Sequence, residues 1–311
     1  MTGPDYRQQQ YGLTLGQLEA IARLRGMAAW HQRKFCKTMR GGPRGALIYK
    51  YMAFEPANPL GMKKARDLIV DSRLYLSAPS DFNDPYDFRA RITVSNDRAG
   101  LRAHFEKSAR RHLDEVGDPI PEVRGRNRKI ETLVARAMSK LTSNPNAVAE
   151  AFERARDNNG VACFSGDPRG LLMWAHYAAG HTGICLQFDV TRDPGVLMIS
   201  HRVTYRDNLP TIEYPNFDDL VDKVIVNKGR AWEAEEEVRY VSMTTVRNSL
   251  PFDGRALVAI ILGLRFPSRH LEDLKRLVDD RVKVGLKAPV VYQAHQKATS
   301  YGIEIKRLRT F

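Results

Sequence analysis

Long hydrophobic runs are missing from this chain of 311 residues. The longest apolar stretch, residues 256–264, falls well short of the roughly 18 residues that a membrane-spanning helix requires. Its composition is instead typical of a buried strand. Residues 1–12 also lack the apolar segment of a signal peptide. We therefore expect no membrane partner.

Cysteine is scarce. The three cysteines, Cys36, Cys163 and Cys185, lie far apart in the sequence and form no CxxC pair. An odd and scattered set argues against a disulfide framework and against a zinc knuckle. We expect a cytoplasmic protein in which the cysteines serve as small buried apolar side chains.

Several familiar catalytic motifs are missing as well. The chain contains no P-loop, no GxGxxG after a strand, no HExxH and no GxSxG elbow. No metal site is predicted either. Asn83, Asp84 and Asp87 surround Pro85 in a pattern typical of a rigid turn, and no bidentate ligand follows at calcium-loop spacing.

Acidic residues are outnumbered by basic ones, which leaves a formal net charge of +13. The excess is uneven, because residues 23–44 hold seven lysines and arginines and no acid. Residues 14–40 have helical spacing and are followed by a Gly-Gly-Pro break. This pattern predicts a basic N-terminal helical arm over residues 1–45, with nucleic acid or another polyanion as the partner. The oligomeric state is not predicted.

The rest of the chain, residues 46–311, has enough apolar residues for a substantial core and is predicted to be one α+β domain. A polar and highly charged stretch at about 97–160 indicates a helical insertion within it. Alternation and β-branched content predict the following strands: 46–52, 74–77, 160–165, 183–189, 238–243, 257–262, 290–293 and 303–305.

The densest acidic cluster lies between Trp232 and Tyr240, with four carboxylates within five positions. If this stretch is extended, Glu235, Glu237 and Arg239 share one face, because side chains alternate along a strand. The other interpretation is a solvated helical turn in which Arg239 pairs with acids three or four positions away. Glu237 is expected to matter more than Glu235, since it lies nearer to the apolar strand that follows.

Two further groups could carry chemistry. His176 and His181 are the most promising histidines, although their spacing does not place both on one helix face, and bonding to the backbone remains the alternative. Lys50 is flanked by Tyr49 and Tyr51 in a predicted core strand. A lysine there requires an anionic neighbour, and the acidic cluster is the obvious source.

Taken together, the motifs resemble a bacterial family that has been catalogued as a domain of unknown function and is often found near phage-defence genes. The resemblance covers about residues 46–310. It rests on five segments in order: Tyr49-Lys50-Tyr51, Ser77-x4-Phe82-Asn83-Asp84-Pro85-x-Asp87, Cys163-Phe164-Ser165, the stretch 174–189 with Trp174, His176, Tyr177 and His181, and Trp232-x2-Glu235-x-Glu237-x-Arg239.

The order of these motifs is in turn similar to that of the ADP-ribosyltransferases. This resemblance implies an ADP-ribosyltransferase-like mixed sheet core and NAD as a substrate. It implies catalytic roles for Glu237 and Glu235, and contacts of NAD with Tyr49, Lys50, Tyr51, Ser77 and Phe82. Arg239 and His176 are further catalytic candidates, and Asn83, Tyr177 and His181 are further candidates for NAD binding. The motif that contains His176 and His181 has no obvious counterpart in the transferases. The early basic position is a lysine here, where the transferases carry arginine or histidine.

The expected function is therefore NAD-dependent ADP-ribosylation in bacterial defence or conflict, with nucleic acid as the favoured acceptor. Two alternatives stay open. One is a metal-independent nuclease or glycosidase that uses Glu235, Glu237 and His176, and the other is a non-enzymatic module that senses a nucleotide or a phage component. Consumption of NAD distinguishes the first function from both alternatives.

Overall fold

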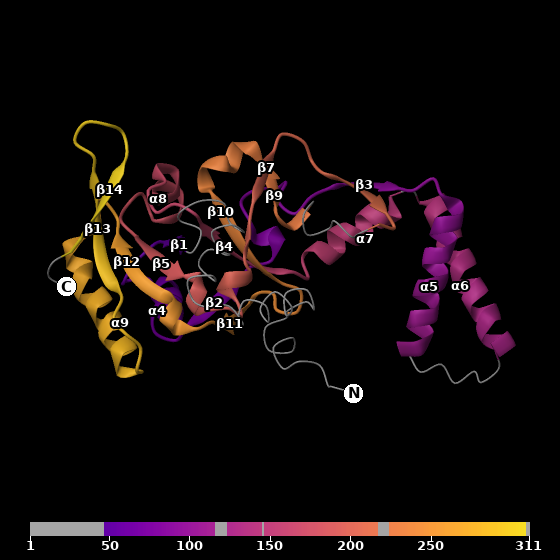
Figure 1. The fold of residues 1–311 in the computed structure, drawn as a ribbon, viewed down its shortest axis with the longest axis horizontal. Coiled ribbons are helices and arrows are strands. Elements are labelled where there is room, and N and C mark those ends of the chain that lie inside the picture. The colour runs from indigo at the N-terminus through magenta and orange to yellow at the C-terminus, as the bar shows by residue number, and fades with distance from the viewer. Residues whose placement is uncertain (1–46, 116–122, 145, 217–223, 309–311) are drawn as a thin grey trace. The chain divides into compact units, whose positions relative to one another are not determined.

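The computed structural model describes residues 47–115, 123–144, 146–216 and 224–308 (Figure 1). The predicted basic arm, residues 1–45, lies outside the described residues. Within the described ranges no helix is both long and apolar enough to cross a membrane.

A large mixed sheet organises the chain, and with the helices it confirms the predicted α+β class. The strands follow the order β14-β13-β12-β5-β1-β4-β10-β6, and each neighbouring pair is antiparallel except β12–β13 (Figure 1). Their bounds are β1 Leu47–Met52, β4 Gly160–Ser165, β5 Ile184–Asp189, β6 His201–Arg202, β10 Glu237–Ser242, β12 Leu257–Leu262, β13 Val290–Gln296 and β14 Ile303–Arg307.

The main hydrophobic core lies against two helices, α4 (Pro59–Ile69) and α9 (Leu271–Lys283). Helix α4 begins where Asn58 accepts hydrogen bonds from the amides of Leu60 and Gly61, with proline at the first helical position. In α9 the buried residues Leu274, Leu277, Val278 and Arg281 recur at helical spacing, so one face packs inward.

A second, smaller core forms around helix α8 (Leu171–Tyr177). Trp174 is fully buried, and its indole nitrogen donates to the Pro168 carbonyl at 2.9 Å. The Tyr51 ring meets the Trp174 ring edge-on, with 5.1 Å between centroids, and the Tyr51 hydroxyl donates to the Asp167 carbonyl at 2.7 Å. These contacts fix β1 against α8.

Short elements connect these layers. Strand β2 (Arg73–Leu76) pairs antiparallel with β11 (Asn248–Pro251), and β7 (Thr204–Arg206) forms a two-stranded sheet with β9 (Asn227–Gly229). The 3-10 turns are η1 Pro79–Asp81, η2 Val190–Arg192, η3 Leu197–Ile199, η5 Arg230–Glu235, η6 Gly254–Ala256 and η7 Ser268–His270.

Residue contacts divide the chain into two compact units. Among the described residues, the first unit comprises 47–87, 157–206 and 228–308 and holds the large sheet. The second comprises 88–115, 123–144, 146–156, 207–216 and 224–227. Its elements are β3 Arg91–Val94, α5 Arg98–Glu115, α6 Val123–Ser143, α7 Ala147–Arg156 and β8 Thr211–Tyr214. The sequence indicates a helical insertion at about residues 97–160. The second unit also includes strand β8 from a later part of the chain, which pairs in parallel with β3.

Arg281 is a buried cation without a carboxylate among its hydrogen-bond partners. Its guanidinium donates to the carbonyls of Ile69 at 2.8 Å, Lys287 at 2.8 Å and Gly254 at 2.5 Å. Burial lowers its pKa from the usual value. The backbone carbonyls nevertheless satisfy its donors, which a buried arginine requires.

Candidate functional site

A cavity of about 440 Å³ opens in the first unit. It is lined by nine of the twelve side chains that the sequence singles out: Tyr49, Lys50, Tyr51, Ser77, Phe82, Asn83, Tyr177, Glu235 and Glu237. Its volume is within the range of small-molecule sites. The remaining three, Arg239, His176 and His181, do not line it.

Strand register explains how distant residues meet here. Tyr49 on β1 lies opposite Ser165 on β4, and Ser165 lies opposite Glu237 on β10. Residues in register on adjacent strands project from the same face of a sheet. The register of β1 against β4 is set by the pair Tyr49 and Ser165.

The two central carboxylates are not arranged as predicted. Glu235 ends the 3-10 turn η5, Glu236 takes a left-handed conformation with φ of 43°, and only Glu237 begins strand β10. The extended interpretation of the whole segment is therefore wrong. The solvated-turn interpretation is also wrong, because Glu235 and Glu237 are both buried, whereas Glu233 and Glu236 are exposed.

Lys228 bridges the two buried carboxylates. Its ammonium nitrogen lies 2.5 Å from Glu235 Oε2 and 3.0 Å from Glu237 Oε2. The same nitrogen lies 4.9 Å from the centre of the Trp232 ring, a cation–π distance. The side chain of Lys228 is 4% exposed. It is thus the cation that allows two glutamates to share one place in the interior.

The guanidinium of Arg239 binds the carboxylate of Glu237. Its Nε donates to Glu237 Oε1 at 2.8 Å, and its Nη2 lies 3.0 Å from Glu237 Oε2 and 2.8 Å from Asp87 Oδ2. Arg239 is 0% exposed, so it supports the cavity without facing it. Asp87 likewise is not a turn cap as predicted, because it is buried and paired with Arg239. Asp84 does cap the turn, by accepting from the Tyr86 amide.

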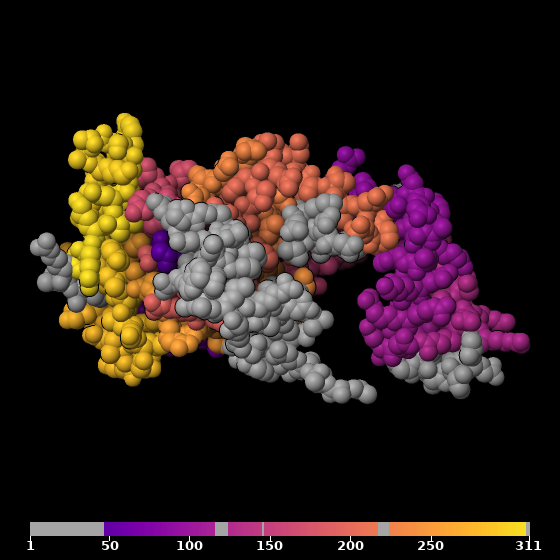
Figure 2. Space-filling model, in the orientation of Figure 1, coloured from indigo at the N-terminus to yellow at the C-terminus, as the bar shows by residue number. Residues whose placement is uncertain are grey.

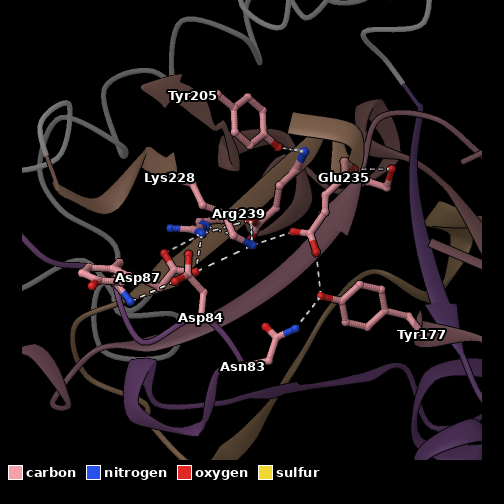
Figure 3. Close-up of polar contacts among 11 residues, drawn as sticks. Asn83, Asp84, Asp87, Tyr177, Tyr205, Lys228, Glu235 and Arg239 are labelled. Carbon is pink, nitrogen blue, oxygen red and sulfur yellow. Dashed lines mark hydrogen bonds and ion pairs between the residues drawn. The ribbon is translucent and has the colours of Figure 1, made fainter. Parts of the chain in front are cut away.

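Tyrosine hydroxyls complete the arrangement around the acids (Figure 3). The Tyr177 hydroxyl donates to Glu235 Oε1 at 2.6 Å and accepts from the Asn83 amide at 3.2 Å. The Tyr205 hydroxyl accepts from the Glu237 backbone amide at 2.7 Å. Each carboxylate oxygen of Glu235 and Glu237 therefore has a hydrogen-bond partner.

The buried cluster consists of Asp87, Glu235, Glu237, Lys228 and Arg239, and the pKa values of its acids Glu237 and Asp87 are shifted in opposite directions. Burial alone would raise the pKa of Glu237, but the charges and hydrogen bonds of Arg239 and Lys228 outweigh it and hold this pKa at about 2. Burial raises the pKa of Asp87 against the opposing effect of Arg239. The pKa of Lys228 is raised, because Glu237 and Glu235 outweigh the effect of its burial. At neutral pH Glu237 is thus a carboxylate and Lys228 an ammonium.

This shift predicts a specific dependence of stability on pH. The pKa of Glu237 is lower when folded, about 2 against 4.5, so its stabilisation is fully present above 4.5 and is lost as pH falls toward 2. We expect this group to cost roughly 2 kcal/mol of unfolding free energy between about pH 6 and about pH 3. Urea unfolding of the native protein and of Glu237→Gln at both pH values measures the difference. Equal acid losses in the two proteins would contradict the prediction.

Lys50 does not pair with the acidic cluster as the sequence suggests. Its ammonium donates to the Cys163 carbonyl at 3.0 Å and lies 5.2 Å from the centre of the Phe164 ring. Burial lowers its pKa, and the charges of Cys163 and Glu237 oppose this. The acidic cluster does pair with a buried lysine, but that lysine is Lys228 and not Lys50.

The histidines lie apart from the cavity lining. His176 is exposed on α8. His181 follows Ala179 and Gly180, and all three have positive φ, of 72°, 48° and 62° respectively. Its ring stacks on Trp174 with 6.4 Å between centroids, and its buried Nδ1 has no hydrogen-bond partner among the described residues. Its position is that of a residue in a tight turn beside the core.

The rim of the cavity carries charge of both signs. Lys64, Arg73, Tyr75 and Asp81 line the cavity and are exposed to solvent. Arg73 donates to the Ser249 carbonyl at 3.0 Å. The rim thus has two cations, Lys64 and Arg73, and one acid, Asp81, whereas three acids and two cations form the buried cluster. In the described ranges no three His, Cys, Asp or Glu side chains gather as metal ligands do.

Sequence reasoning missed Lys228 and the role of Asp87. Lys228 follows an apolar run, 224–226, and lies seven positions before Glu235, so no local spacing connects them. The available signal was the need of a buried acidic pair for a cation. No family model, no curated protein and no solved structure matches the chain.

Proposed function

We propose that the cavity binds NAD and that the protein transfers ADP-ribose from NAD to an acceptor, with nucleic acid as the acceptor class. The observation that carries this proposal is the pair of buried acidic side chains, Glu235 and Glu237, held together by Lys228 in a cavity with aromatic walls. The similarity of the motif order to ADP-ribosyltransferases supports it as well.

The chemistry requires a site that stabilises positive charge. Cleavage of the bond between nicotinamide and ribose sends the bonding electron pair to the ring nitrogen and leaves an oxocarbenium-like ribose. The lone pair of the acceptor then forms the new bond at the same carbon, and the acceptor loses a proton. Carboxylates that are already in place stabilise this state without reorganisation. The buried cluster has one more acid than cations, which favours a developing positive charge.

Glu235 is the better candidate for contact with the ribose. Its side chain is 11% exposed, compared with 4% for Glu237, and Arg239 contacts only the latter. In this proposal Glu235 accepts from a ribose hydroxyl and faces the developing charge. Glu237 keeps Lys228 in position. This reverses the ranking expected from the sequence.

The charge distribution favours one orientation of the dinucleotide. The nicotinamide and its ribose would face the acidic cluster between the rings of Tyr49, Phe82 and Tyr177, which line the cavity. The diphosphate would lie toward Lys64 and Arg73 at the rim. Aromatic stacking and cationic contacts suit these two parts of the ligand.

The test is incubation of the purified protein with NAD labelled in the adenosine part, with total cellular RNA, DNA and protein as acceptors. We expect release of nicotinamide and transfer of the label to nucleic acid. Cleavage of RNA or DNA without NAD would overturn the proposal in favour of a nuclease. Binding of NAD with no turnover would overturn it in favour of a sensing module.

A further inference from the structure

Among the helices and strands of the second unit, α6 has the largest excess of basic over acidic residues. It carries six lysines and arginines and a single acid, Glu131. It lies beside α5, and the two helices form a hairpin, magenta in Figures 1 and 2. Ala109, Leu113, Ile130 and Val134 form the buried core of this hairpin.

The basic residues of α6 are placed regularly. Arg124, Arg128, Arg136 and Lys140 are separated by four, eight and four positions, and all are exposed. At 3.6 residues per turn they fall within an arc of roughly 160°, opposite the side that buries Ile130 and Val134. The row is about 24 Å long at 1.5 Å per residue. The solvent face of α6 therefore carries a stripe of basic side chains.

The stripe is not neutralised within its own unit. Arg124, Arg128, Arg136 and Lys140 form no ion pair with any residue in the described part of the chain. Arginines elsewhere in the hairpin do form pairs: Arg102 with Glu131, at 2.5 Å, and Arg126 with Asp114. The acids of the hairpin thus neutralise other cations and leave the stripe charged.

We propose that this stripe, Arg124, Arg128, Arg136 and Lys140, binds the phosphate backbone of a nucleic acid. The rise between successive cations is about 6 Å over four helical residues and about 12 Å over eight, so the row can follow the repeated phosphates of a strand. Two positions within the same arc, Thr132 and Ser139, are exposed and polar. Such side chains also donate to phosphates and sugars.

A nucleic acid fits this surface better than an anionic membrane does. A helix that lies in a membrane interface needs large apolar side chains exposed along one face. The apolar side chains of α6 point the other way, because Ile130 and Val134 are buried and Leu133 and Met138 pack on the same core. The stripe therefore attracts phosphates by charge and offers no anchor for lipid chains.

The binding proposal stands independently of the proposed transferase activity, because it is measured without NAD. The variant is the double substitution Arg128→Gln and Arg136→Gln in the full chain. The matched control is Arg102→Gln and Arg126→Gln, which removes the same charge from paired positions of the same hairpin. Fluorescence anisotropy with labelled single-stranded RNA and double-stranded DNA gives Kd over a series of salt concentrations.

We expect the stripe variant to bind at least one of these nucleic acids on the order of 10-fold more weakly. The slope of log Kd against log salt should become shallower by about two, since each lost phosphate contact removes nearly one. The control should change both quantities much less. Equal effects of variant and control would overturn the proposal. An unchanged slope of log Kd against log salt in the stripe variant would also overturn it. The same holds if the stripe variant loses binding to phosphatidylserine vesicles as strongly as it loses binding to nucleic acid. Circular dichroism checks that both variants fold.

Discussion

Replacement of Arg239 by methionine is expected to lower the free energy of unfolding by about 3–5 kcal/mol. Arg239 is fully buried, and its guanidinium contacts Glu237 and Asp87 at 2.7–2.8 Å. Methionine fills similar space but leaves Asp87 without its guanidinium and Glu237 with Lys228 alone. The expected loss is large because an uncompensated buried charge costs several kcal/mol. Urea unfolding near neutral pH measures it.

A matched control separates burial from charge. Arg247 also pairs with an aspartate, Asp81, at 2.9 Å, but its side chain is 52% exposed. Arg247→Met should therefore cost less than about 1 kcal/mol. If Arg239→Met cannot be purified, Arg239→Lys keeps the charge and should give an intermediate loss. Equal costs at positions 239 and 247 would show that the buried cluster does not stabilise the fold as described.

The second large effect concerns turnover of NAD. Glu235→Gln keeps the size of the side chain and an oxygen for Lys228, and the Tyr177 hydroxyl can turn to accept from the new amide. What disappears is the negative charge next to the developing ribosyl cation. We therefore expect kcat for nicotinamide release to fall by about 10²-fold or more. Binding of NAD and the melting temperature should change little by comparison.

Exposed glutamates of the same segment provide the comparison. Glu233 and Glu236 flank Glu235 and are both exposed, so their replacement by glutamine should leave kcat unchanged. A Glu235→Gln protein with full activity would exclude this carboxylate from the proposed chemistry. If Glu236→Gln lost as much activity as Glu235→Gln, the effect would come from the net charge of the segment and not from one contact.

The parts of the fold that depend on local pattern were predictable. Strand β4 (Gly160–Ser165) and strand β12 (Leu257–Leu262) have the bounds that the sequence predicts. Both are short runs of mainly apolar residues, which suit a strand with two covered faces. That β5 lies between β1 and β12 depends instead on long-range packing, about which a local pattern contains no information.

The site was predictable in composition and not in arrangement. The spacing of Glu235 and Glu237 identified the acidic pair, and the aromatic motif around Lys50 identified another wall of the cavity. The left-handed residue Glu236 could not be foreseen, because this conformation is uncommon outside glycine. Lys228 and Asp87 approach the pair only through folding, at 7 and 148 positions from Glu235.

The carbonyl-bound guanidinium of Arg281 has a consequence for how the molecule opens. It joins the end of α4 at Ile69, the turn before β12 at Gly254 and the loop after α9 at Lys287. None of the three can move away without exposing an arginine whose donors have lost their acceptors. These segments are therefore expected to open together, as one foldon, with backbone amides that exchange their hydrogens at a common slow rate.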